Sequence, residues 1–263
     1  MIQPNGGFIL PTYEPSDYVF GGPISLKSKG FSGTVLQPNG DWTSFAPPGE
    51  PQHKESLDTL ACATFTTLNG LEILMKRVHD LDLNFSERFV AKATDTDKKR
   101  GNDPKAVAQF VRKNWSVLEK DYPLVSSKDE YYQDIPQELF PLAQKYKGNK
   151  LFGYELVNPD PASLREALKL SPVGLSNALT EGEDGRYYKP HNWRDVHIST
   201  LLKIEADGTY VILDSYFPYI KRIHPNFKSE YAIRWELDAE LYSLLTRLKY
   251  ALRDLVALLT KGV

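Results

Sequence analysis

The sequence has only one cysteine, Cys62, among its 263 residues. A chain with one thiol can form no internal disulfide and no metal site built from several thiolates. No apolar run approaches the roughly 18 residues of a membrane-spanning helix. The first seven residues have neither a cationic stretch nor an apolar stretch of the length that a signal peptide needs. These absences exclude a disulfide-rich scaffold and an integral membrane protein.

The chain also lacks an excess of charge of either sign. It has 32 Lys and Arg against 34 Asp and Glu, a formal net charge of −2, so nucleic acid is not the expected partner. Hydrophobic residues make up 41% and charged residues 25%, which is the composition of a globular protein. The histidines His79, His191 and His224 show no metal-ligand spacing, and we expect no metal and no other cofactor.

The residue pattern changes along the chain. Residues 1 to about 56 are rich in Gly and Pro, which predicts turns and loops. Asp58 or Thr59 is the expected N-cap of the helix that follows. Apolar spacing predicts helices over residues 62–78, 86–94, 104–114, 137–147 and 162–170, and β-rich segments follow at residues 172–175, 197–205 and 210–214. Helices followed by antiparallel strands are typical of the α+β class.

The last segment has a pattern of its own. Leucines recur at steps of four and three from Leu241 to Leu259 and predict an amphipathic, heptad-patterned helix over residues 236–263. Such a stripe either docks on the body of the protein or pairs with a second copy of the chain, forming a homo-oligomer. We therefore divide the chain into an N-terminal extension (1–40), a main domain (41–235) and this helix.

Cys62 stands at the start of a predicted helix, where the macrodipole favours a thiolate and lowers the pKa of the thiol. The alternative is a small core residue that only packs. A thiolate nucleophile needs an imidazole to take its proton and an acceptor that fixes the imidazole. Of the five histidines, only His197 begins a β-rich segment that folds back to present a polar side chain, that of Asp214.

The length of the turn decides whether His197 and Asp214 meet. A four-residue loop over residues 205–208 places Asp214 opposite Ser199, with His197 as its diagonal neighbour on the same face. A two-residue turn would leave His197 two pairs away from Asp214. The pair therefore needs the longer loop or a bulge.

Fragments of the chain, in order over roughly residues 41–220, resemble motifs of the papain-like cysteine peptidases. They are Asp41-Trp42, Cys62-Ala63-Thr64-Phe65 with Glu72, Phe85-Ser86-Glu87-Arg88, Gly101, Asp121-Tyr122-Pro123, Ser171-Pro172-Val173-Gly174, Val196-His197-Ile198 and Leu213-Asp214-Ser215-Tyr216. The chain looks like the prokaryotic and bacteriophage members, which lack a pro-domain. The resemblance implies a two-lobed fold, with a helical lobe and an antiparallel lobe like a β-barrel. It also implies a cytoplasmic or virion-associated location.

The resemblance implies a catalytic triad. Cys62 is expected to attack a peptide carbonyl, and His197 to carry the thiol proton to the leaving amine. Asp214 stands where the family has asparagine and is expected to orient the imidazole. A carboxylate can accept from the imidazole N–H and stabilises imidazolium more strongly than an amide does.

The remaining site residues follow from the same resemblance. Gln52, together with the backbone N–H of Cys62, is expected to hold the oxyanion, and Ser56 is the alternative to Gln52. Gly101 falls where the family's backbone pairs with the substrate. Tyr216 is expected at the substrate site, in place of a tryptophan that shields the hydrogen bond of the histidine.

The pattern favours a thiol endopeptidase that acts on proteins or peptides through an acyl-enzyme. A transglutaminase-type acyl transferase has the same order of residues, but its cysteine and histidine are closer in sequence than residues 62 and 197. A third alternative is a papain-like fold with a structural or assembly role, which a Cys62 sealed from solvent would favour. Residues 1–40 either lie across the active site as a plug or cover the body of the domain.

Overall fold

The computed structural model describes residues 6–29, 31–55 and 57–238. Its α-helices are α1 (Cys62–His79), α2 (Glu87–Ala93), α3 (Pro104–Asn114), α4 (Lys128–Tyr131), α5 (Leu139–Lys147) and α6 (Pro161–Leu168). Its strands are β1 (His53–Lys54), β2 (Leu57–Asp58), β3 (Phe152–Val157), β4 (Val173–Asn177), β5 (Thr180–Glu181), β6 (Tyr187–Tyr188), β7 (His197–Ile204), β8 (Tyr210–Leu213), β9 (Ile220–Ile223) and β10 (Ala232–Leu237). Two 3₁₀ turns, η1 (Leu26–Lys29) and η2 (Thr43–Phe45), precede α1.

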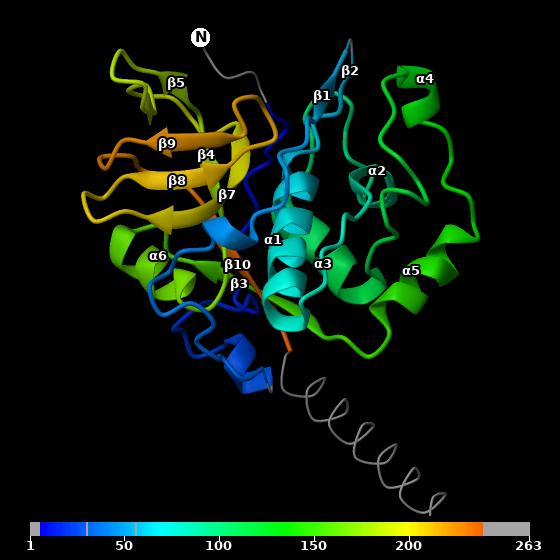
Figure 1. The fold of residues 1–263 in the computed structure, drawn as a ribbon, viewed down its shortest axis with the longest axis horizontal. Coiled ribbons are helices and arrows are strands. Elements are labelled where there is room, and N and C mark those ends of the chain that lie inside the picture. The colour runs from blue at the N-terminus through cyan, green and yellow to red at the C-terminus, as the bar shows by residue number, and fades with distance from the viewer. Residues whose placement is uncertain (1–5, 30, 56, 239–263) are drawn as a thin grey trace, which may run out of the picture.

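The described chain has a helical half and a sheet half. Figure 1 shows α2 to α5 on one side, the main sheet with α6 on the other, and α1 between them. The sheet has eight strands in the order β3-β10-β4-β7-β8-β9-β6-β5, and the pairs from β3 to β9 are antiparallel. The α+β class is confirmed. The sheet does not close on itself, because β3 and β5 are its edges in the described residues, so the expected barrel-like lobe is an open sheet.

Helix α1 joins the two halves. The hydroxyl of Thr66 donates to the carbonyl oxygen of Ile198 in β7 at 2.9 Å. Gly70 lies against the indole of Trp235 in β10, and a methyl group added at Gly70 would overlap the ring. A glycine inside a helix costs about 1 kcal/mol relative to alanine. Close packing of the helix on the sheet explains why this position has no side chain.

Most predicted helices are confirmed with small shifts at their ends. Helix α3 has the predicted bounds, and the side chain of Asp103 caps it by accepting from two backbone N–H groups of the first turn. The predicted cap of α1 is wrong, because Ala61 precedes that helix and no side chain caps it. The carboxylate of Asp58 instead accepts from the N–H of Leu60 at 3.0 Å, which is part of the loop before the helix.

Strand β3 lies ahead of α6, where the sequence predicts no strand. All six of its residues are buried, so no alternation of apolar and polar residues marks it. Its one charged residue, Glu155, pairs with Arg234 of β10 at 2.6 Å, and both side chains are buried. The charged residue interrupts the apolar run of this buried strand, so the sequence did not predict the strand.

Strands β7 and β8 form the hairpin that the sequence predicts. Thr200 pairs with Leu213, which is the register that places Asp214 opposite Ser199. A bulge in β7 follows nearer the turn. The condition for bringing His197 close to Asp214 is therefore met.

The N-terminal extension and the end of the main domain both contribute to the packing of the described chain. The extension packs on the body of the domain. The N–H of Phe20 donates to the carbonyl oxygen of Leu156 at 2.8 Å, and the N–H of Leu36 donates to the carbonyl oxygen of Lys169 at 3.0 Å. Strand β10 continues through Leu237, past the expected end of the main domain at residue 235. Residues 239–263 lie outside the described residues, and with them most of the heptad-patterned helix, its docking and its pairing with a second copy.

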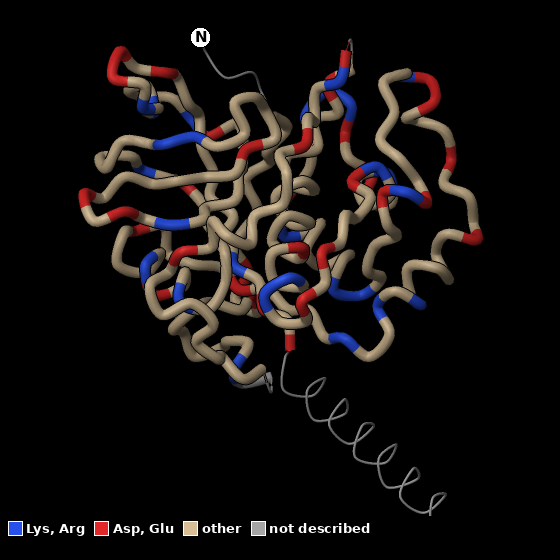
Figure 2. Tube along the Cα trace, viewed as in Figure 1, with Lys and Arg blue, Asp and Glu red and all other residues tan. Residues whose placement is uncertain are grey.

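Charge is spread over the molecule. Figure 2 shows basic and acidic residues interspersed along the trace in both halves, in keeping with the formal net charge of −2. In the part of the chain that the structure describes, no helix combines the length and the hydropathy needed to cross a bilayer.

Two carboxyl groups are buried in the helical half. Glu72 of α1 accepts from the N–H of Phe85 at 2.7 Å. Neither side-chain oxygen of Glu87, at the start of α2, has a hydrogen-bond partner among the described residues. Burial raises the pKa of both groups well above the usual range, and the negative charges of Glu50 and Glu119 act in the same direction. Glu87 therefore keeps its proton well above the pH at which an exposed glutamate loses it.

The variant Glu87→Gln is expected to become more stable than the wild type as the pH rises. A carboxyl group with a raised pKa in the folded state stabilises the protein fully below the unfolded-state pKa of about 4.3. That stability is lost at about 1.4 kcal/mol per pH unit as the pH rises toward the folded-state pKa. Urea unfolding should give similar stabilities at acid pH and a gap in favour of the variant at neutral pH. Glu183→Gln, at an exposed turn, is the control, and parallel curves for Glu87→Gln and wild type would refute the buried-acid assignment.

Candidate active site

Two N–H donors converge on one carbonyl oxygen. The backbone N–H of Cys62, the first residue of α1, donates to the carbonyl oxygen of Gly6 at 3.3 Å. The side chain of Gln52 donates from Nε2 to the same oxygen at 3.1 Å. Preorganised donors aimed at one oxygen are what an oxyanion hole requires. In this structure the oxygen belongs to the chain itself.

Gln52 is buried and held from several directions. Its Oε1 accepts from the hydroxyl of Ser215 at 2.7 Å, and its backbone N–H donates to the carbonyl of Ser215 at 3.1 Å. Its backbone carbonyl accepts from the N–H of Thr59 at 3.2 Å. These contacts join the loop before α1 to the end of β8 and aim Nε2 at Gly6. Ser56, the alternative donor, lies outside the described residues.

His197 begins β7 and is paired with Asp214 after the end of β8. Its Nε2 lies 2.9 Å from Asp214 Oδ1, and both side chains are buried. The backbone N–H of Tyr216 donates to the same Oδ1 at 2.9 Å, and the ring centroids of His197 and Tyr216 are 5.2 Å apart. The hydroxyl of Tyr216 donates to Asp58 Oδ2 at 2.6 Å. Tyr216 thus packs against the imidazole and is anchored at its far end.

Cys62 and His197 both lie against Gly6. The thiol of Cys62 interacts with the backbone of Ile198, the residue after His197. A methyl group added at Gly6 would overlap Nδ1 of His197. That nitrogen has no hydrogen-bond partner among the described residues. Nδ1 of His197 therefore faces Gly6, the residue whose carbonyl oxygen accepts from Gln52 Nε2 and the Cys62 N–H.

Residues 6–9, called here the 6–9 segment, run between the two halves. On the sheet side, the N–H groups of Gly6 and Phe8 donate to the carbonyl of Val196 at 3.1 and 3.2 Å. On the helical side, the N–H of Ile9 donates to the carbonyl of Asn102 at 3.0 Å. With the segment in place, the nucleophile and base candidates have no exposed surface. Of the two expected placements of the extension, these residues take the one across the site.

Gly101, expected to pair with the substrate, lies against the 6–9 segment, and its own backbone groups bond elsewhere. Both of its backbone groups bond to Asp97, at 2.9 and 2.8 Å, and the bond to the carbonyl of Gly7 comes from the N–H of Asn102 at 2.8 Å. Gly101 has a φ of +87°, and a methyl group there would overlap the carbonyl oxygen of Gly7. Gly101 permits the close approach, and Asn102 makes the hydrogen bonds.

Burial dominates the electrostatics of the site. Burial raises the pKa of the Cys62 thiol, and the negative charge of Asp214 raises it further. Hydrogen bonding to the backbone of Ile198 lowers this pKa, but by less than burial raises it. The lowered thiol pKa expected at a helix start is therefore not found while the 6–9 segment covers the sulfur. Burial also raises the pKa of Asp214, but the charges of His197 and Lys221 outweigh it and lower that pKa to about 2.

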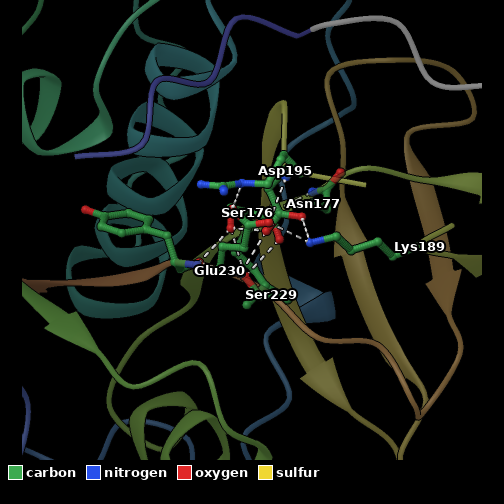
Figure 3. Close-up of polar contacts among 9 residues, drawn as sticks. Ser176, Asn177, Lys189, Asp195, Ser229 and Glu230 are labelled. Atoms are coloured by element: carbon green, nitrogen blue, oxygen red, sulfur yellow. Dashed lines mark hydrogen bonds and ion pairs between the residues drawn. The ribbon is translucent and has the colours of Figure 1, made fainter. Parts of the chain in front are cut away.

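A polar network braces the chain just before β7. Figure 3 shows its labelled side chains clustered together, with Lys189 extending toward them from one side. Asp195 Oδ2 accepts from the hydroxyl of Ser176 at 2.6 Å and from the N–H of Glu230 at 2.8 Å. Lys189 Nζ lies 2.6 Å from Asp195 Oδ1 and 3.1 Å from Glu230 Oε1. The network fixes Val196, whose carbonyl binds the 6–9 segment.

The structure brings together Cys62, His197, Asp214, Gln52 and Tyr216, and it adds residues that the patterns missed. Lys221 Nζ lies 2.9 Å from Asp214 Oδ2. In β9, exposed and buried residues alternate, and Lys221 stands at a buried position. A lysine at a buried position of an alternating strand indicates a buried partner of opposite charge, and this signal could have identified Lys221. For Gly6 and Asn102 no spacing in the sequence pointed to the site. Among the described residues, no three His, Cys, Asp or Glu side chains are arranged to hold a metal ion.

Comparison with known proteins supports the fold. No known family profile and no curated protein matches the chain. The bromelain protease from Ananas comosus, solved with the E64 inhibitor, matches with a TM-score of 0.57 and 14% identity over 74% of this chain and 97% of that chain. Procathepsin L 3 of the Tenebrio molitor larval midgut matches with a TM-score of 0.56 and 14% identity, over 78% and 71%. The ragweed pollen cysteine protease Amb a 11, in its proform, matches at 0.55 and 14%, over 77% and 67%. The chain has the fold of the papain-like cysteine proteases.

Proposed function

We propose that the protein is a thiol endopeptidase whose nucleophile is Cys62. The observation that carries the proposal is the carbonyl of Gly6, which accepts from Gln52 Nε2 and the Cys62 N–H while His197 Nδ1 faces the same residue. A peptide carbonyl bound to these donors is polarised for attack. A nucleophile, a base and an oxyanion hole around one carbonyl are what acyl transfer needs.

The chemistry would proceed through two acyl transfers. His197 Nδ1 takes the thiol proton, and the Cys62 sulfur forms a bond to the substrate carbonyl carbon. The negative charge on the carbonyl oxygen is held by Gln52 Nε2 and the Cys62 N–H. The intermediate collapses as His197 gives its proton to the leaving amine. Water then attacks the thioester with His197 as base, which releases the acid and restores the thiol. Asp214 keeps Nδ1 directed at the reaction.

In the same proposal, the 6–9 segment holds the enzyme inhibited. Hydrolysis requires a proton donor at the leaving nitrogen, which in this segment is the amide of Gly7. His197 Nδ1 instead lies where a side chain of Gly6 would project, on the α-carbon side of the carbonyl. The segment also runs parallel to Asn102. The carbonyl of Gly6 therefore fills the oxyanion donors, while the side of it that faces His197 Nδ1 is the α-carbon and not the leaving nitrogen of Gly7.

The second candidate is a non-catalytic structural role, and the observation in its favour is a Cys62 with 0% exposure. Part of the cover is backbone without side chains, since Gly6 lies against the ring of His197 and Gly7 against the backbone of Leu60. The carbonyl of Gly6 accepts from the Cys62 N–H and from Gln52 Nε2, the two donors that the proposed catalysis would use. We therefore favour a catalytic site covered by the 6–9 segment over a non-catalytic structural role.

Substitution of Cys62 tests the proposal. After release of the 6–9 segment, the wild type is expected to hydrolyse labelled casein and to react with an epoxysuccinyl inhibitor, and Cys62→Ala to do neither. The thermal unfolding of Cys62→Ala serves as the control for folding. Hydrolysis that survives in Cys62→Ala would remove the thiol from the mechanism, and an inert wild type would favour the structural role.

A further inference from the structure

Lys221 occupies the second oxygen of the buried carboxylate that holds His197. The two oxygens of Asp214 are divided, with Oδ1 bound to His197 Nε2 at 2.9 Å and Oδ2 lying 2.9 Å from Lys221 Nζ. Lys221 Nζ also donates to the carbonyl of Tyr216 at 2.7 Å. The side chain of Lys221 is 4% exposed, so the ion pair is shielded from water. A contact of this kind is strong because the interior screens charge weakly.

The geometry of β8 and β9 produces this arrangement. The chain leaves β8 at Leu213, turns, and returns in β9, where Leu213 pairs with Ile220. Lys221 is therefore on the inner face directly beyond the turn that carries Asp214. Its Nζ also lies 5.6 Å from the ring centroid of Tyr187 in β6, which adds a cation–π contact. The segment after β8 and strand β6 thus both contact the ammonium group of Lys221.

Titratable groups from several elements face the pair. From the loop before α1, Asp58 bonds to the Tyr216 hydroxyl, and from α1 the Cys62 thiol is coupled to the charge of Asp214. Tyr187 and Tyr216 contribute hydroxyl groups whose pKa values burial raises, so they remain neutral. Lys221 therefore lies within ion-pair distance of Asp214, on the oxygen that His197 does not contact.

We propose that Lys221 is a positioning residue of the triad, which binds Oδ2 of Asp214 and offsets its charge so that Asp214 orients the imidazole much as a neutral amide would. The proposal rests on the function proposed above. An uncompensated buried carboxylate holds a proton on the neighbouring imidazole over a wider pH range. A protonated imidazole cannot accept the proton of the thiol. The cation keeps His197 available as a base while the carboxylate still fixes its orientation.

The titration of the His197 ring, followed by NMR of the histidine ring protons, tests this role without any need for activity. The His197 signal is assigned by its absence in His197→Ala. In Lys221→Met, the midpoint of the His197 titration is expected to move to higher pH by about one unit or more, because a unit charge close to the pair is removed. Lys221→Arg keeps the charge and is expected to keep the midpoint. Lys203→Met, on the same strand as His197 but paired with Asp41, is the matched control.

A midpoint that does not move in Lys221→Met would overturn the proposal. If Lys221→Met fails to fold, Lys221→Gln keeps a hydrogen-bond donor without the charge, and the same shift is required of it. The outcome separates this role from the proposed function. A shifted midpoint in a chain that hydrolyses no peptide would support Lys221 and refute the peptidase. An active peptidase in which Lys221→Met leaves the His197 midpoint unchanged would support the peptidase and refute the role of Lys221.

Discussion

Cutting the chain between Pro15 and Ser16 is expected to raise the alkylation rate of Cys62 by about two orders of magnitude or more. Both residues are exposed, so the recognition sequence of a site-specific protease can be inserted there and cut after folding. While tethered, the 6–9 segment has an effective concentration in the millimolar range, and dilution of the freed peptide removes this advantage. The rate is measured with iodoacetamide before and after cutting, followed by removal of the peptide.

The matched control carries the same recognition sequence between Glu183 and Asp184, two exposed residues of the turn between β5 and β6. Cutting there leaves the 6–9 segment attached, and the alkylation rate should stay low. A rate that rises equally in both proteins would indicate general loosening of the fold. A rate that rises in neither would mean that the 6–9 segment is not what protects Cys62.

Adding the segment back should restore protection. A synthetic peptide of residues 1–15 is expected to slow alkylation of the cut protein. The same peptide with Gly6→Leu is not, because a side chain at Gly6 would overlap Nδ1 of His197. A peptide with Leu10→Ala should still protect, since Leu10 is 41% exposed and lies beyond the bonded residues. Equal protection by all three peptides would argue against specific binding in the site.

The second large effect is expected at Gln52. In the cut protein, Gln52→Ala should lower kcat by about 10²–10³, since one of two oxyanion donors is removed. In the uncut protein, the same substitution should raise the alkylation rate of Cys62, because Gln52 also holds the carbonyl of Gly6. Opposite effects on two readouts distinguish a donor from a residue that only supports the fold. Gln133→Ala, at an exposed position, is the control.

A loss of less than about fivefold in kcat would remove Gln52 from the oxyanion hole, since loss of a preorganised donor costs far more. Thermal unfolding of Gln52→Ala is needed beside the kinetics. Gln52 also bonds to Ser215 and Thr59, so part of any loss could come from the loop that it anchors. A kcat lowered in a variant with unchanged unfolding temperature is the result that the proposed role requires.

Most helices and strands near the site could be predicted from local sequence patterns. Apolar spacing located α1 and placed Cys62 at its start, and a count across the β7–β8 turn showed that His197 and Asp214 meet only with a bulge or a long loop. Both conclusions depend on the backbone alone. The helix cap at Asp58 was predicted from residue type and is wrong, because that carboxylate bonds to Tyr216, far away in sequence.

The features that the sequence did not reveal depend on contacts between distant segments. Gly6 and Gly7 look like an ordinary turn, and only the fold brings them over Cys62. Lys221 is one lysine among many until β9 places it beside Asp214. The thiol pKa was expected to fall at a helix start, yet burial in the folded chain raises it. Short-range patterns carry no information on such encounters.

The most direct test is the mass of the intact cut protein after treatment with an epoxysuccinyl inhibitor. We expect a single adduct on Cys62 in the wild type and, over the same time, none in His197→Ala, because the imidazole must take the thiol proton. Equal labelling of the wild type and His197→Ala, or no labelling of either once the 6–9 segment is gone, would contradict a catalytic pair formed by Cys62 and His197.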